Sequence, residues 1–159
     1  MPQTIQYQLR RASKQDAHLL WEWANDPVVR GQAFHPAPIP WETHEQWLDS
    51  RLESPTCLMA ILETATGMPV GQIRFDQVAE GVEVDLSVAA AHRGQGLGHD
   101  LLRHGLEEAR TRWPAGTRVI AKVLRDNARS MWVFERCGFL SRGLRFSQGK
   151  SYHYLERML

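Results

Sequence analysis

Three glycines alternate with other residues in the stretch RGQGLGHD, at Gly94, Gly96 and Gly98. The stretch follows a strand-like run and opens a helix-like one. A helix that begins directly after a strand exposes free backbone N–H groups, and glycine lets an anion approach them without an intervening Cβ. This chemistry predicts a phosphate-binding turn, and a tight turn that simply uses glycine is the alternative.

Two known nucleotide-binding motifs fit this turn poorly. A Walker A loop needs Lys and then Ser or Thr after its last glycine, whereas His99 and Asp100 follow Gly98 here. A dinucleotide fingerprint needs a third glycine where His99 stands, within a strand–helix–strand unit. We therefore exclude the first motif and disfavour the second.

Three carboxylates precede the turn in the stretch AEGVEVDLSV, at Glu80, Glu83 and Asp85. The alternation of a strand places Glu83 and Asp85 on one face with Ser87, opposite the apolar residues of the same run. A carboxylate can serve as a general base. A merely solvated carboxylate is the alternative.

The elements that must position these groups follow from hydrophobic periodicity. Alternation predicts a strand over 5–12, and Ser13 with Asp16 opens a helix over 13–26. Pro27 and the three prolines of FHPAPIPW predict a shaped loop. The remaining expected elements are a helix over 41–53, strands over 56–64, 70–77 and 81–88, a helix after the glycine turn, a strand over 117–124, a helix over 127–137 and a closing hairpin of 139–146 with 151–159.

This order predicts an α+β fold with a mixed, mostly antiparallel sheet flanked by helices. The length of 159 residues suits one domain, residues 1–159. A formal net charge of +1 argues against a nucleic-acid partner. With no signal-like start and no apolar run of membrane-spanning length, we expect no membrane association and a cytoplasmic location.

The two cysteines, Cys57 and Cys137, lie far apart in the sequence and lack metal-ligand spacing. We therefore expect reduced thiols in the core and no metal ion.

The pattern V-x-x-x-x-R-G-x-G-x-G from Val88 to Gly98 resembles the signature of the GNAT superfamily, whose members are acyltransferases that use acetyl-CoA. The stretch NARSMWVFERCGF resembles a later motif of that superfamily, with an Asn after a strand and Gly-Phe after a helix. The resemblance covers nearly the whole chain. It implies the GNAT fold and acetyl-CoA as co-substrate.

Carried over residue by residue, the resemblance implies a cofactor site. The fourth strand would pair with the pantetheine arm, the glycine turn would bind the pyrophosphate, and an N–H near Val88 would polarise the thioester carbonyl. Asn127 would touch the far side of the cofactor, or else only cap its helix. The implied cofactor residues are Leu86, Ser87, Val88, Arg93, Gly94, Gln95, Gly96, Leu97, Gly98, His99, Asn127 and Ser130.

The resemblance also implies a general base and a general acid. Superfamily members commonly carry a carboxylate on or just before the fourth strand, for which we favour Glu83 and place Glu80 second. Many carry a tyrosine acid in the later helix, where this chain has Phe134. Tyr152, Tyr154 or water remain as substitutes.

The first third of the chain should bind the acceptor, because the rest forms the sheet and the cofactor site. The stretches LLWEWANDPVVRGQAF, PIPWETHEQWLDSRL and PVGQIRFD resemble the amino-sugar branch of the superfamily. That branch includes an acetyltransferase that acts on a nucleotide-linked 4-amino sugar in pseudaminic acid synthesis. The candidate acceptor residues are Arg30, His35, Arg74 and Asp76. We therefore expect a small-molecule amine as partner and N-acetylation for surface glycan synthesis, with a homodimer as an option.

Two other functions stay open. Related chains that share the W-x-x-D-P style of first helix acetylate the N-terminal residue of ribosomal proteins. The absence of a tyrosine at Phe134 also leaves a catalytically inactive CoA-binding module.

Overall fold

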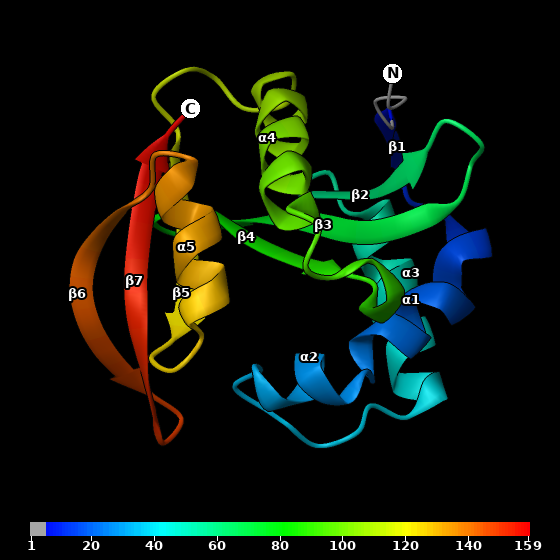
Figure 1. The fold of residues 1–159 in the computed structure, drawn as a ribbon, viewed down its shortest axis with the longest axis horizontal. Helices are drawn as coiled ribbons and strands as arrows, with labels where there is room; N and C mark the ends of the chain where they lie inside the picture. The colour runs from blue at the N-terminus through cyan, green and yellow to red at the C-terminus, as the bar shows by residue number, and fades with distance from the viewer. Residues whose placement is uncertain (1–5) are drawn as a thin grey trace.

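A computed structural model describes residues 6–159 as a seven-stranded sheet with helices on both faces (Figure 1). The strand order is β1-β2-β3-β4-β5-β7-β6, and all neighbouring strands are antiparallel apart from the parallel pair β4 and β5. The predicted α+β class is confirmed. The strands are β1 (Tyr7–Arg11), β2 (Cys57–Thr64), β3 (Pro69–Val78), β4 (Gly81–Val88), β5 (Arg118–Leu124), β6 (Leu140–Ser147) and β7 (Lys150–Met158).

The helices follow the expected order, with one additional short helix, α2. They are α1 (Ala17–Ala24), α2 (Pro27–Gly31), α3 (Trp41–Glu53), α4 (Leu97–Arg110) and α5 (Ala128–Arg136), with short 3₁₀ turns η1 (Lys14–Asp16) and η2 (Ala90–His92). The predicted helix over 41–53 matches α3 residue for residue. Ile5, the first residue of the predicted first strand, lies outside the described residues.

The region around Pro27 differs from the prediction. The expected helix over 13–26 is a 3₁₀ turn followed by α1, which ends at Ala24. A second helix, α2, then begins at Pro27, where we expected only a loop. Proline suits the first position of a helix because its missing N–H has no intrahelical partner there. Asp26 supplies the cap, since its carboxylate accepts from the N–H groups of Val28 and Val29.

The main core lies between the sheet and α4 with α5. Leucines on one side of α4 pack on β3 and β4, and Phe134 of α5 packs on Phe139 with 5.0 Å between ring centroids. Gly105 of α4 faces β3 so closely that a Cβ there would overlap Ile73 Cδ1. The glycine therefore sets the distance between helix and sheet.

A second core joins α1 and α3 to the opposite face of the sheet, through Leu20, Leu48, Met59 and Ile61. His44 of α3 is only 3% exposed, and its Nε2 lies 3.1 Å from the carbonyl oxygen of Ala17. Burial lowers the pKa of His44, because the apolar surroundings disfavour the charged imidazolium.

Both cysteines are free and buried, as predicted. Burial raises the pKa of the Cys57 thiol to about 12 and also raises that of Cys137. Both thiols therefore stay protonated and unreactive at neutral pH. Within residues 6–159, no helix combines the length and apolar character needed to cross a membrane, and no cluster of three or more His, Cys, Asp or Glu side chains suits a metal ion.

Candidate active site

The parallel strands β4 and β5 separate after a short contact. Their pairing consists of Val82 with Val119 and Glu83 with Ile120, and it ends there. Beyond Glu83, β4 continues to Val88 along β3 alone. The stretch from Leu86 to Val88 therefore has a free edge on its β5 side.

Backbone groups of this free edge point toward the gap. The Ala89 N–H donates to the carbonyl of Val70 on β3, at 2.9 Å. Because backbone direction alternates along a strand, the N–H groups of Val88 and Leu86 point the other way, toward β5. A chain with amide groups can bond to such an edge as a further strand would.

The glycine turn lies just beyond the end of β4. Gly94 and Gly96 have φ values of 80° and 77°, a conformation that glycine adopts without strain. The first hydrogen bond of α4 runs from the Asp100 N–H to the Gly96 carbonyl, so the three preceding N–H groups are not used by the helix. These groups form an anion-binding helix N-terminus next to open space, because nothing lies within 4 Å of a Cβ placed at Gly96.

Gly98 and Arg93 have roles that the sequence did not reveal. A Cβ at Gly98 would stand 3.2 Å from Cγ2 of Val133, so this glycine lets α4 pack against α5. Arg93 donates from Nε to the Val88 carbonyl at 3.1 Å and from Nη2 to Asp26 at 3.0 Å. It therefore fastens the turn to β4 and to α2.

The later motif begins α5 beside the turn. The Asn127 side-chain oxygen accepts from the Ser130 N–H at 3.2 Å. Asn127 therefore caps α5, which is one of the two roles predicted for it. Its side-chain NH₂ group takes no part in this bond. Ser130 is half-buried in the first turn of α5.

The candidate bases occupy different places on β4. Glu83 stands at the last β4–β5 pair, and its carboxylate lies 3.4 Å from the ammonium group of Lys122. Asp85, the next residue on this face, is exposed within the diverging part. Glu80 lies in the β3–β4 turn, before the strand begins, and is not brought to the divergence. The sequence did not identify Lys122 as the partner of Glu83. The alternation of β5 could have indicated that its side chain lies on the same face of the sheet.

Phe134, at the position of the superfamily's tyrosine acid, and the two tyrosines that could replace that acid lie in different parts of the fold. Phe134 is buried in the main core. Tyr152 and Tyr154 project from β7 on the face opposite the main core, where they pack with Ile120 and Phe34. The two tyrosine rings are buried, and the Arg145 guanidinium lies 3.6 Å from the Tyr154 ring centroid.

Arg74 and Asp76 are adjacent on the face that also carries Glu83. Arg74 Nε lies 2.6 Å from the Asp76 carboxylate, and its guanidinium lies 4.9 Å from the Trp47 ring centroid. Burial by itself would lower the pKa of Arg74, but the nearby Asp85 and Asp76 carboxylates outweigh this effect and raise it. Arg74 is therefore a charged group held by internal partners.

Arg30 and His35 form a separate pair in the Pro-rich segment. Arg30 donates from Nε to the Ala24 carbonyl at 2.6 Å and from Nη1 to the His35 carbonyl at 2.9 Å. Lys150 donates to Ala33 at 2.8 Å, which connects this segment to the β6–β7 hairpin. Arg30 thus holds the shape of the loop.

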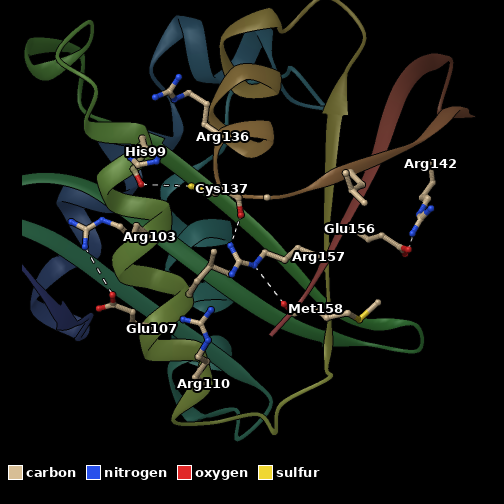
Figure 2. Close-up of a pocket in the computed structure, with 13 residues that line it drawn as sticks. His99, Arg103, Glu107, Arg110, Arg136, Cys137, Arg142, Glu156, Arg157 and Met158 are labelled. Atoms are coloured by element: carbon tan, nitrogen blue, oxygen red, sulfur yellow. Dashed lines mark hydrogen bonds and ion pairs between the residues drawn. The ribbon is translucent and has the colours of Figure 1, made fainter.

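An arginine-lined cavity of about 650 Å³ lies between α4, the end of α5 and β7 (Figure 2). It borders the third residue of α4, His99, and extends along the outer side of that helix. Glu156 binds Arg142 at 2.8 Å, whereas Arg110, Arg136 and Arg157 form no ion pair among residues 6–159. The cavity is thus strongly cationic. Its arginines are Arg103, Arg110, Arg136, Arg142 and Arg157.

Comparison with known proteins agrees with this geometry. A family model described as an acetyltransferase (GNAT) domain matches residues 7–140. No curated protein matches the chain closely enough to count as a relative.

Solved acetyltransferase structures share the fold over nearly their whole length. A ribosomal-protein-alanine N-acetyltransferase from Brucella melitensis is 24% identical, with a TM-score of 0.81 over 96% of this chain and 99% of that one. YncA, a putative acetyltransferase from Salmonella typhimurium solved with acetyl-CoA, is 21% identical, with a TM-score of 0.80 over 96% and 94%. Spermidine N-acetyltransferase from Vibrio cholerae, solved with CoA and spermine, is 17% identical, with a TM-score of 0.83 over 96% and 95%.

The family match spans most of the chain, and the glycine turn follows a fourth strand with a free edge, the two features on which the resemblance placed the cofactor. The chain belongs to the GNAT family of acetyl-CoA-dependent N-acetyltransferases.

Proposed function

We propose that this enzyme acetylates the amino group of a nucleotide-linked amino sugar for surface glycan synthesis, at the point where β4 and β5 diverge. The observation that carries the proposed site is the free edge of Leu86 to Val88, which lies between Glu83 and the glycine turn. This edge joins a carboxylate at one end to an anion site at the other.

The residues present fit acetyl-CoA, which supplies an activated acetyl group. The edge from Leu86 to Val88 would bond to the pantetheine amides, and the N–H groups of residues 95–99 would hold the pyrophosphate. Asn127 and Ser130 would border the other side. The cavity beside His99 suits the remaining charge, with Arg103 and Arg136 as ligands for the 3′-phosphate.

The chemistry requires a neutral amine. Glu83 would accept the amine's proton through water, so that nitrogen attacks the thioester carbonyl and the C–S bond then breaks. The Val88 N–H would stabilise the charge that develops on the carbonyl oxygen. A thiol has a pKa of about 8.5, so the thiolate can leave unprotonated, and the core position of Phe134 does not prevent transfer.

The acceptor would lie between the sheet face that carries Arg74 and the Pro-rich segment. Both provide polar groups: Arg74 and Asp76 on β3, and Arg30 with His35 in the segment. Because Arg74 and Arg30 already have internal partners, they would orient the acceptor through their remaining N–H groups.

The nucleotide requirement is tested by comparing kcat/KM for a 4-amino sugar with and without its nucleotide. We expect the nucleotide-linked form to be favoured by about tenfold to a hundredfold, since a charge-assisted hydrogen bond contributes about 1.5 to 3 kcal/mol. Equal values would contradict the nucleotide-linked acceptor.

A peptide N-terminus is the second candidate acceptor. It is favoured by the similarity to the ribosomal-protein-alanine N-acetyltransferase, which covers 99% of that chain. A higher kcat/KM for an alanine-initiated peptide than for any amino sugar would select it.

A further inference from the structure

Arg93 joins the cofactor side of the enzyme to the acceptor side. Its guanidinium donates to the carbonyl of Val88, the last residue of β4, and to the carboxylate of Asp26, the residue before α2. Both side chains of the ion pair are only 20% exposed. The Arg93 guanidinium therefore contacts Val88 and Asp26, which are 62 residues apart in sequence. Its position depends on both segments.

One carboxylate oxygen of Asp26 accepts three hydrogen bonds. Oδ1 accepts from Val28 N–H at 2.9 Å, from Val29 N–H at 3.3 Å and from Arg93. Burial opposes the charge on this carboxyl, but Arg93 and the amides outweigh burial and lower its pKa. Asp26 is therefore ionised at neutral pH, both as the cap of α2 and as the partner of Arg93.

The segment that begins at Asp26 runs to the proposed acceptor site. Arg30 of α2 bonds to the His35 carbonyl, and Ala33 accepts from Lys150. Phe34 contacts Tyr152 of β7, with ring centroids 5.3 Å apart. The only side-chain ion pair between residues 26–40 and the glycine turn, among residues 6–159, is the one from Asp26 to Arg93.

We propose that Asp26 is a positioning residue that couples the cofactor site to the acceptor segment through Arg93. Order at the glycine turn fixes Arg93, Arg93 fixes Asp26, and Asp26 fixes the start of the segment over 26–40. Because coupling between two sites is reciprocal, CoA should order this segment, and an acceptor bound there should strengthen CoA binding. The inference rests on the proposed cofactor site.

Amide hydrogen exchange tests the coupling without using turnover. In the unmodified enzyme, saturating CoA should slow exchange over residues 27–40 by about fivefold or more, the lower range of typical coupling. Asp26→Asn keeps an oxygen for the α2 amides but removes the charge that binds Arg93. In this variant CoA should still bind by calorimetry, and the slowing over 27–40 should be lost.

Two further variants separate coupling from simple loss of the cap. Arg93→Lys leaves Asp26 and its amide bonds intact but removes the forked contact, and it should also abolish the slowing. Asp49→Asn removes an exposed α3 carboxylate that is ion-paired with Lys14, and should behave like the unmodified enzyme.

The outcomes distinguish the two proposals. CoA binding without slower exchange over 27–40, or slowing that persists in Asp26→Asn, would overturn the coupling alone. No CoA binding by the unmodified enzyme would overturn the proposed cofactor site and the coupling with it.

Discussion

Glu83 stands where two parallel strands stop pairing, 3.4 Å from Lys122. Its position at the start of the free β4 edge distinguishes it from Glu80, which lies in a turn before the strand. The two glutamates therefore form a matched pair for testing the base.

Glu83→Gln should lower kcat by about a hundredfold at neutral pH, because general base catalysis typically contributes 10² to 10⁴. The deficit should shrink as pH rises, since more of the acceptor amine is then already neutral. Steady-state kinetics across pH measures this, with Glu80→Gln as the control that should retain activity. An equal loss at every pH would assign Glu83 a packing role, and a loss only in Glu80→Gln would reverse the assignment.

Arg136 is the residue that tests the cationic cavity. It lines the cavity without an ion-pair partner among residues 6–159, and it lies at the end of α5. Arg136→Ala should weaken CoA binding by about tenfold but leave the affinity for dephospho-CoA unchanged, because only CoA carries the 3′-phosphate. Calorimetry with both ligands decides this, and Arg11→Ala, on β1 and outside the cavity lining, controls for overall charge. Equal weakening for both ligands would remove Arg136 from the 3′-phosphate site.

At the scale of elements, α4 belongs both to the main core and to the proposed cofactor site. Its first turn provides free N–H groups, whereas Gly98 and Gly105 let it lie close to α5 and β3. The geometry of the glycine turn therefore depends on one contact within the first turn of the helix, at Gly98, and on one further along it, at Gly105.

Gly105→Ala should destabilise the fold by about 1 to 3 kcal/mol, because its Cβ would overlap Ile73 and crowd Phe75. Thermal unfolding should show a lowered Tm. Gly31→Ala is the matched control, since nothing lies within 4 Å of a Cβ at that helical glycine. If Gly105→Ala proved as stable as the unmodified protein, α4 would not be held at the distance described here.

The elements were largely predictable from sequence, because alternation and helical periodicity depend on local pattern. The bounds of α3 and β4 were predicted correctly. The loop predicted at Pro27 was wrong. Proline ends a helix when it lies in the interior, but here Asp26 caps a new helix, α2, that begins at Pro27.

The contacts of the site were harder to predict, because they join residues distant in sequence. The tie from Arg93 to Asp26, the Lys122 partner of Glu83 and the packing of Gly98 on Val133 all depend on how elements meet. The arginines of the cavity come from α4, α5, β6 and β7, and no local pattern unites them. Arg74 and Asp76 were both candidate acceptor residues from the sequence, and the structure pairs them with each other.

At the scale of the whole molecule, buried ionisable groups make stability depend on pH. The folded state lowers the pKa of His44 below its ordinary value of 6.5 because burial disfavours the charged form. The unfolded chain therefore binds more protons below about pH 6.5, and the contribution of His44 is fully present above that pH and is lost as pH falls.

His44→Gln should accordingly reduce the pH dependence of the free energy of unfolding between about pH 6.5 and 5, by at most about 1.4 kcal/mol per pH unit. Denaturant unfolding at several pH values measures the difference. Identical slopes in His44→Gln and the unmodified protein would show that His44 is not held neutral in the folded state.

We propose that the enzyme transfers an acetyl group to a primary amine at the site where β4 and β5 diverge. The most direct measurement is thiol release from acetyl-CoA in the presence of nucleotide-linked amino sugars, aminoglycosides and N-terminal peptides. We predict release that requires an amine, is fastest with a nucleotide-linked amino sugar and falls about a hundredfold in Glu83→Gln. Tight CoA binding without thiol release for any amine would contradict the claim and identify the chain as an inactive CoA-binding module.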